Sequence, residues 1–163
     1  MESLLTDRWY TWNHEWFRAI RSGTLQYGLT PAFFVGVSEL EGLELPVVGA
    51  AIVPGGSLGM IEFSKTVFEL QSPIAGTIVR VNESLRTTPN LLLRAPYSDG
   101  WIVELDCDGD ELESLRKTGT LVTGVDYFAQ TSQITNSTME SATGSESAQD
   151  QSASPRTEEA DGR

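Results

Sequence analysis

Short runs in which apolar and polar residues alternate mark the first 128 residues of the chain. A period of two is typical of strands that bury one face. Residues 101–106 show it most clearly, and residues 43–47 repeat it over a shorter stretch. Residues 24–30 and 76–82 are further candidate strands, and Pro54-Gly55-Gly56 has the composition of a turn between strands. The pattern predicts a mainly β domain.

One helix is expected near the end of this domain. Asp108 has a side chain that can cap a helix start, and Glu111 stands three residues later, as in a capping box. Two leucines then give an apolar face, and Gly119 is a typical helix stop. A second, weaker helix candidate begins near Pro31. We therefore expect one or two short helices beside the strands.

The composition changes sharply after residue 128. Residues 129–163 are rich in Ser, Thr, Gln, Glu and Ala, with six acidic side chains, two basic ones and no aromatic residue. Such a segment cannot bury enough apolar surface to offset its conformational entropy. We therefore predict three parts: a lead-in at residues 1–8, a folded domain at residues 9–128 and a disordered acidic tail at residues 129–163.

The chain is acidic, with 23 Asp and Glu residues against 11 Lys and Arg residues and a formal net charge of -12. Such a surface repels phosphate backbones and anionic lipids, so neither a nucleic acid nor a membrane is an expected partner. No apolar run approaches the roughly 18 residues of a membrane helix, and no signal or transit peptide is visible. We expect a cytoplasmic monomer whose partners present basic faces.

The residues that usually build metal or nucleophilic sites are scarce. Cys107 is the only cysteine, and His14 is the only histidine. One cysteine excludes an intrachain disulfide and a cysteine-based zinc cluster, and one histidine cannot form a histidine-based metal site. No nucleophile and base stand at a recognisable spacing. We therefore expect no metal and no catalytic activity, with His14 packing locally and the four tryptophans in the core.

Lysine is rare in this chain, since only Lys65 and Lys117 are present. Lys117 stands where a basic side chain suits a helix C-terminus. Lys65 lies between two extended runs, residues 58–63 and 67–71, at the expected tip of a hairpin. A solvated lysine at such a tip commonly serves only to discourage edge-to-edge pairing. A modified lysine is the alternative, and the surrounding residues favour it.

Residues around Lys65 and across the whole domain match one family in order and spacing. Glu62 stands three residues before the lysine, and Pro73 and Gly76 follow it. Further matches lie outside the hairpin: Tyr10-Thr11, His14-Glu15-Trp16, Gly28-Leu29-Thr30, Glu44-Leu45-Pro46, Val81-Asn82, Pro96-Tyr97 and Gly100-Trp101. Together they resemble the H protein of the glycine cleavage system, a lipoyl-lysine carrier. The resemblance covers about residues 9–128, and no single motif carries it alone.

This resemblance implies a flattened β-barrel, the barrel-sandwich hybrid of lipoyl-like domains, with a short C-terminal helix. It implies lipoate joined covalently to Lys65, with Glu62 and Gly76 contributing to recognition by the modifying enzyme. In this family a loaded arm folds into a cleft, and Glu15 and Glu69 match the acidic residues that hold its amine. The purely structural interpretations are a surface acid at Glu15, a solvent-facing strand residue at Glu69 and a positive-φ turn at Gly76.

The implied partners are glycine decarboxylase, aminomethyltransferase, dihydrolipoyl dehydrogenase and a lipoyl ligase or transferase. The chain would then be a non-catalytic carrier that shuttles an aminomethyl group among these enzymes. A biotinyl domain is disfavoured, because Ser64 and Thr66 flank Lys65 where biotinyl domains normally carry methionines.

Some positions depart from the family pattern. Phe33-Phe34 stands in a segment that usually forms a short helix of different composition, so we weigh an exposed aromatic patch against ordinary burial. Phe63 also departs from the family's usual residue beside the lysine. These differences leave two alternatives open. One is an H-like lipoate-binding protein of another pathway, such as bacterial sulfur oxidation, and the other is an unmodified interaction scaffold.

Overall fold

The computed structural model describes residue 4 and residues 6–143. The chain divides into one compact unit, residues 1–129, and a second unit, residues 130–163. The strands and the candidate site all belong to the first unit.

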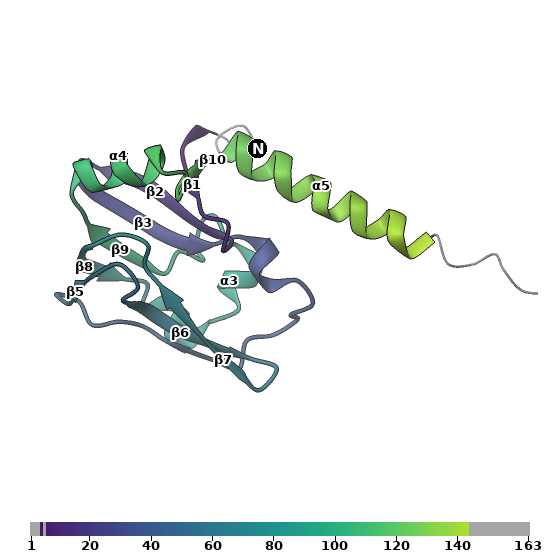
Figure 1. Ribbon diagram of the computed structural model, residues 1–163. Helices are drawn as coiled ribbons and strands as arrows, with labels where there is room; N and C mark the ends of the chain where they lie inside the picture. Colours follow the sequence, from purple (N-terminus) through teal and green to yellow (C-terminus); the bar gives the residue numbers. More distant parts are fainter. Residues whose placement is uncertain (1–3, 5, 144–163) are drawn as a thin grey trace, which may run out of the picture. The chain divides into compact units, whose positions relative to one another are not determined.

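Two antiparallel sheets build the first unit (Figure 1). The larger, seven-stranded sheet has the order β10-β1-β2-β3-β9-β8-β5, and the three-stranded sheet has the order β4-β6-β7. Their strands are β1 (Trp9–Tyr10), β2 (Glu15–Arg21), β3 (Thr24–Leu29), β4 (Gly42–Glu44), β5 (Ala51–Ile52), β6 (Ser57–Phe63), β7 (Thr66–Gln71), β8 (Gly76–Val81), β9 (Val103–Asp106) and β10 (Val122–Thr123). The expected mainly β fold is confirmed.

The hydrophobic core takes side chains from both sheets. Tyr27 and Leu29 of β3 and Leu105 of β9 represent the larger sheet, and Ile61 of β6 and Leu70 of β7 represent the smaller one. Each of these side chains is at most 3% exposed. Because successive side chains of a strand point to opposite faces, the alternation seen in the sequence places these residues together.

The four strands expected from the sequence are present as β3, β4, β8 and β9. Strands β3 and β8 each end one residue earlier than expected, whereas β4 already ends at Glu44 and β9 begins only at Val103. Pro46 has no N–H to donate to a ladder, which is consistent with the early end of β4. The turn expected at Pro54-Gly55-Gly56 is also present, since the Gly56 N–H donates to the Val53 carbonyl at 2.7 Å.

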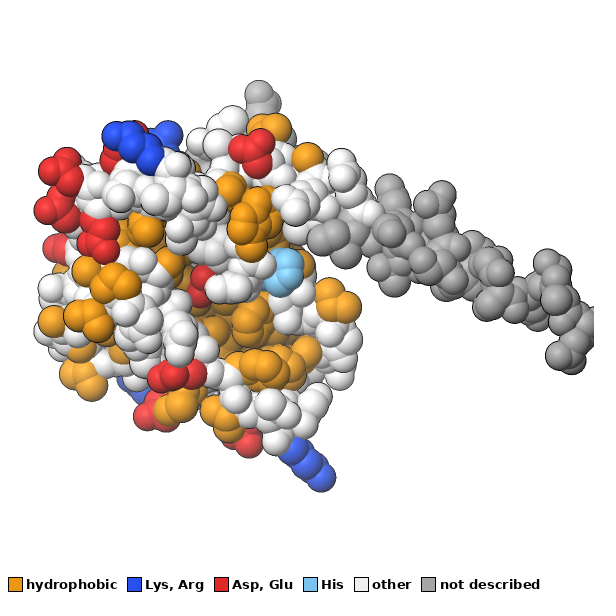
Figure 2. Space-filling model, viewed as in Figure 1, with side chains coloured by type: hydrophobic (Ala, Val, Ile, Leu, Met, Phe, Trp, Pro, Cys, Tyr) orange, Lys and Arg blue, Asp and Glu red, His pale blue; other side chains and the backbone are white. Residues whose placement is uncertain are grey.

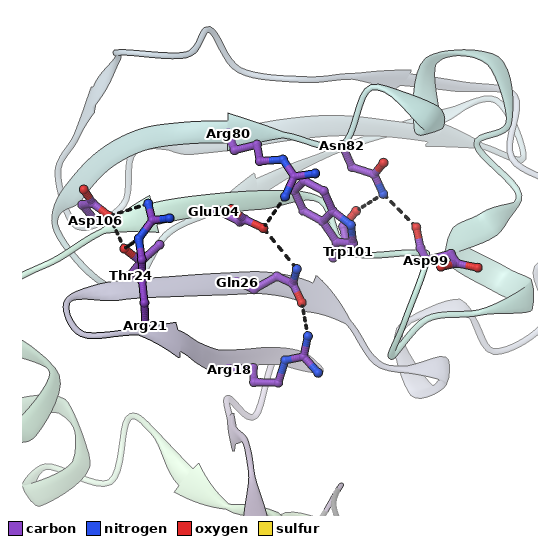
Figure 3. Close-up of polar contacts among 10 residues, drawn as sticks. All are labelled: Arg18, Arg21, Thr24, Gln26, Arg80, Asn82, Asp99, Trp101, Glu104 and Asp106. Carbon is purple, nitrogen blue, oxygen red and sulfur yellow. Dashed lines mark hydrogen bonds and ion pairs between the residues drawn. The ribbon is translucent and has the colours of Figure 1, made fainter.

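A chain of polar side-chain contacts crosses the neighbouring strands β2, β3, β9 and β8 (Figure 3). Arg18 donates to the Gln26 carbonyl oxygen at 2.9 Å, and the Gln26 amide donates to Glu104 at 3.3 Å. Glu104 also accepts from Arg80 at 3.2 Å, and the Arg80 guanidinium lies 4.9 Å from the Trp101 ring centroid. Glu104 is only 4% exposed. A buried carboxylate needs such partners, so the chain of contacts favours this strand order over others.

The helix expected near the end of the domain is α4 (Gly109–Lys117). Asp108 caps it by accepting from the Asp110 N–H at 2.9 Å, and Gly119 follows it with a φ of 75°. Glu111 does not close a capping box. Its carboxylate accepts instead from the Ala75 N–H at 2.8 Å, which ties the helix to the segment before β8.

The other short helices are single turns. The candidate near Pro31 is a turn of 3-10 helix, η1 (Pro31–Phe34), and α2 (Ser84–Thr87) and α3 (Leu91–Arg94) follow β8. Among the described residues, no helix is both long enough and apolar enough to cross a membrane.

A longer helix, α5 (Gly124–Thr143), was not expected. The structure is helical where residues 129–143 were expected to be disordered, and residues 144–163 lie outside the described part of the chain. Neither Gly nor Pro occurs between residues 125 and 143. Asp126 in the first turn suits the helix N-terminus, and its N–H donates to Thr123 Oγ1 at 3.2 Å. Tyr127, which is 1% exposed, anchors that turn in the first unit.

Candidate functional site

Lys65 lies at the tip of a tight hairpin between β6 and β7. The last paired residues are Phe63 and Thr66, so Ser64 and Lys65 alone form the turn. Both have positive φ, 51° for Ser64 and 59° for Lys65. Two successive residues with positive φ are what a type I′ turn requires, because its twist matches that of the strands. The hairpin expected around Lys65 is therefore confirmed.

The Lys65 side chain is exposed and carries no ion pair among the described residues. Its backbone N–H faces the Glu41 carboxylate at 3.3 and 3.4 Å, and the Glu41 N–H donates to the Glu62 carbonyl at 2.7 Å. Glu62 is itself exposed on β6. The turn is thus held through its backbone while the lysine amine remains accessible for acylation.

Four phenylalanine side chains pack together beside the strands of this hairpin. Phe63 and Phe68 stack across the strand pair with centroids 4.7 Å apart and an interplanar angle of 11°. Phe33 contacts Phe68 edge-on at 6.2 Å, and Phe34 contacts Phe63 edge-on at 6.3 Å. Phe34 is 5% exposed, and Phe33 is half-buried. Of the two interpretations of Phe33-Phe34, burial therefore fits the structure better, and the segment supports the two strands that carry Lys65.

Glu15 and Glu69 line one surface hollow of about 400 Å³, although they belong to different sheets. The other lining residues are Trp12, Asn13, His14, Phe33, Leu70 and Gln71. Figure 2 shows acidic and hydrophobic side chains in a depression close to the pale blue histidine. Glu69 is exposed on β7, four residues after Lys65. The sequence thus predicted two acids that the structure brings to one place.

Glu15 is not a surface acid, because it is only 5% exposed. One carboxylate oxygen accepts from Thr11 Oγ1 at 2.7 Å, and the other accepts from the Tyr27 hydroxyl at 3.0 Å. Burial raises the pKa of Glu15 above its ordinary value of 4.5, and the two hydrogen bonds oppose that shift. The side chain is therefore a fixed, partly desolvated acid at the wall of the hollow.

Glu15 gives a testable pH dependence. A carboxyl whose pKa is raised by folding stabilises the protein when protonated, so its contribution to the unfolding free energy falls as pH rises above about 4.5. Because glutamine does not ionise, we expect this pH-dependent contribution to the unfolding free energy to be absent in Glu15→Gln. The difference in unfolding free energy between Glu15→Gln and the parent, measured by urea titration at about pH 4.5 and about pH 7.5, should shift in favour of the variant at the higher pH.

The contribution of His14 to the unfolding free energy depends on pH in the opposite direction. Burial lowers the pKa of His14 below 6.5, so this contribution is lost as the pH falls. It is present in both proteins, so it cancels in the difference. An equal difference at both pH values would contradict the assignment of a raised pKa to Glu15.

His14 packs locally, as expected. Its Nδ1 lies 2.7 Å from the Tyr127 hydroxyl, which also lies 2.9 Å from Thr30 Oγ1. The residue has a φ of 65°, so the chain turns sharply between Thr11 and β2. Within the described residues, no group of three His, Cys, Asp or Glu side chains is arranged to hold a metal ion.

Gly76 begins β8, and its φ is not among the positive values. The interpretation of Gly76 as a positive-φ turn is therefore wrong. A Cβ at this position would lie 2.5 Å from the Asp106 carbonyl oxygen and 3.1 Å from Leu105 Cδ1. The glycine is required because the neighbouring strand β9 approaches so closely.

Trp12 is an exposed residue of the hollow that the sequence did not indicate as part of a site. It was assigned to the core with the other tryptophans, but it is 44% exposed. It lies in the loop between β1 and β2, inside the motif that contains Glu15, and that position was the available signal. Alternation could not reveal it, because a loop residue has no regular face.

A β domain that presents an exposed lysine on a rigid two-residue turn, near an acidic hollow, has the features of a carrier with a covalently attached arm. The family model described as glycine cleavage H-protein matches residues 8–133. The chain belongs to this family.

Relatives and a solved structure agree with this assignment. The chain is 30% identical over 131 residues to the glycine cleavage system H protein of Mycobacterium tuberculosis (strain H37Rv), which covers 80% of this chain and 98% of that protein. It is 32% identical over 114 residues to the same protein of Mycobacterium sp. (strain KMS), covering 70% and 87%. A crystal structure of the H protein from Mycobacterium marinum superposes with a TM-score of 0.62 at 29% identity, covering 77% of this chain and 97% of that one.

These matches confirm the family and the fold expected from the sequence. Proteins of this family carry lipoate, and the chain is a lipoyl carrier of the glycine cleavage system. It therefore acts together with the other components of that system.

Proposed function

We propose that the lipoyl group is attached to Lys65 through an amide bond to Nζ. Three features support this assignment: the exposed amine, the lack of an ion-pair partner among the described residues, and the tight turn that holds the Lys65 backbone. Lys117, the other lysine, lies at the end of α4, where Glu113 is 4.0 Å from its amine. Attachment would remove the charge of Lys65 and place a dithiolane at the end of a long arm.

We propose that Glu62 and Gly76 are needed for modification in different ways. Glu62 is exposed on the strand that leads into the turn, so it can contact the modifying enzyme directly. Gly76 keeps β8 close to β9, so its contribution to recognition is through the shape of the domain. The modifying enzyme would be a lipoyl ligase or a lipoyl transferase.

The hollow would receive the loaded arm. Glu69 lies four residues from Lys65, or about 13 Å along an extended strand, a span that the lysine side chain and a long acyl chain can cover. We propose that Glu69 pairs with the amine of the cargo and that Glu15 adds negative charge from the wall of the hollow. Both oxygens of Glu15 already accept hydrogen bonds, whereas Glu69 is exposed.

The proposed partners are glycine decarboxylase, aminomethyltransferase and dihydrolipoyl dehydrogenase. On this proposal the chain is their shared substrate and has no catalytic activity of its own. Its formal net charge of -12 favours partners with basic surfaces. A cytoplasmic location and a monomeric state remain predictions from the sequence.

Glycine-dependent exchange of carbon dioxide tests whether the lipoyl arm carries an aminomethyl group. With glycine decarboxylase from a glycine cleavage system, the lipoylated chain should support exchange of labelled carbon dioxide into glycine, and the unmodified chain should support little. A lipoylated chain that supports no exchange would favour the alternative, a lipoate carrier of another pathway.

A further inference from the structure

Trp12 is an exposed aromatic side chain within the candidate arm-binding hollow. Its side chain lines this hollow together with Glu15 and Glu69, and it also lines an adjoining hollow of about 420 Å³. A single exposed aromatic residue needs no explanation by itself. An exposed indole in a hollow that is also lined by two acidic side chains does call for one.

The Trp12 ring is held in position by its neighbours. It stacks on Tyr127 with centroids 6.1 Å apart and an interplanar angle of 28°. Tyr127 is 1% exposed, and its hydroxyl is fixed by the contacts with His14 and Thr30. The indole therefore presents an aromatic face with a preset orientation, so little conformational entropy is lost when a ligand contacts it.

The charges around this face suit a cation. Glu15 and Glu69 are acidic, and no Lys or Arg is among the residues that line the hollow. Both oxygens of Glu15 are already engaged by Thr11 and Tyr27. Glu69 is exposed and accepts only a long hydrogen bond, from Gln71 Nε2 at 3.4 Å, so it is the carboxylate more available to a cation in the hollow. Such a cation would need a further contact on its other side.

We propose that Trp12 is a binding residue for the loaded arm, whose terminal ammonium group lies against the indole face while Glu69 provides the opposing charge. Among aromatic side chains, tryptophan gives the strongest cation–π contact. This inference rests on the proposed attachment of the arm to Lys65. It adds a contact that distinguishes an ammonium cargo from a neutral one.

A stable analogue of the cargo tests the contact without glycine decarboxylase. The dithiolane of the lipoylated chain is reduced to two thiols with a phosphine. The arm thiolates are then alkylated with 2-bromoethylamine, which releases bromide and leaves on each sulfur an aminoethyl group that ends in an ammonium. The matched control uses 2-iodoethanol, which displaces iodide and leaves a neutral hydroxyl group of similar size. Burial raises the pKa of Cys107 to about 11, so this thiol competes weakly at about pH 8. Intact mass confirms which groups were added.

The readout is the indole N–H resonance of Trp12 in a nitrogen-15 NMR spectrum, assigned by its loss in Trp12→Phe. We expect this resonance to shift with the ammonium-bearing arm and to shift much less with the hydroxyl-bearing arm. Equal shifts would mean that the arm packs on Trp12 without recognition of charge, and no shift with either arm would mean that it does not bind there. Either result overturns the inference while leaving attachment at Lys65 untouched.

The second readout is the lifetime of the natural cargo after loading with glycine and glycine decarboxylase. Loss of the aminomethyl group, followed by intact mass, should be about five-fold faster in Trp12→Leu than in the parent and nearer the parent rate in Trp12→Phe. Val47→Ala is the control, because Val47 is an exposed apolar residue that does not line the hollow and has no part in the support of the hairpin. Equal rates in all four proteins would overturn the inference, and a parent that is lipoylated but never loads would contradict the glycine-cleavage cargo as well.

Discussion

Lys65→Arg is expected to abolish lipoylation completely. Arginine keeps the positive charge and much of the length of lysine, but its guanidinium stays protonated at any accessible pH and is a poor nucleophile. The substituted side chain would still project from an exposed turn, so the fold should be unaffected. After incubation with lipoate, ATP and a lipoyl ligase, intact mass should show one added lipoyl group on the parent and none on the variant.

Lys117→Arg is the matched control, because the chain contains only these two lysines. Lys117 lies on α4, where its amine is 4.0 Å from Glu113. This variant should accept the lipoyl group as fully as the parent does. A modified Lys65→Arg protein together with an unmodified Lys117→Arg protein would move the attachment site to Lys117 and refute the proposal.

Gly76→Ala should be the most destabilising of the substitutions considered. The added Cβ would lie 2.5 Å from the backbone oxygen of Asp106, an atom that cannot move without disturbing the β8–β9 pair. Overpacking of this kind costs about 1–3 kcal/mol, and a clash with backbone belongs at the upper end. We expect a loss of about 3 kcal/mol in the free energy of unfolding, measured by urea titration.

Gly109→Ala is a suitable control for the same chemical change. Gly109 is the first residue of α4, and a Cβ there would meet nothing within 4 Å. Its stability should be unchanged or slightly higher, because alanine favours the helix. Equal denaturation midpoints for Gly76→Ala and the parent would show that the close approach of β9 does not require a glycine at position 76.

The same variant separates two explanations of why Gly76 matters for modification. At low temperature and without denaturant, a destabilised chain can still be mostly folded. If folded Gly76→Ala accepts the lipoyl group at the parental rate, the role of the glycine lies in stability. If Gly76→Ala is folded but accepts the lipoyl group slowly, the modifying enzyme recognises the local shape of β8.

The sequence identified the elements whose patterns are local. Alternation predicted β9, because Val103 and Leu105 lie in the apolar core and Glu104 between them points to the other face. The short runs at residues 24–30 and 76–82 predicted β3 and β8. The cap at Asp108 and the stop at Gly119 predicted α4, because both signals depend on a few adjacent residues. The hairpin of Lys65 followed from two such strands meeting at a two-residue turn.

What the sequence could not reveal depended on contacts between distant segments. The sequence left two interpretations of Glu15, a cleft acid or a surface acid, and its burial could not be predicted because its hydrogen-bond donor Tyr27 lies on the next strand. The constraint on Gly76 comes from the backbone of Asp106, which no local pattern contains. Helix α5 was missed because its composition resembles that of disordered segments, while its first turn is anchored by the packing of Tyr127 on Tyr10 with ring centroids 4.7 Å apart.

The two acids of the hollow belong to different sheets, and that arrangement has a mechanical consequence. Glu15 lies on the seven-stranded sheet and Glu69 on the three-stranded one, so no shared ladder sets their separation. Side chains from both sheets, among them Leu29 and Leu70, pack together in the apolar core and are almost fully buried. Leu70→Ala would leave a cavity in this core and allow one sheet to shift against the other, so we expect it to change the separation of the two carboxyl groups as well as the stability of the fold.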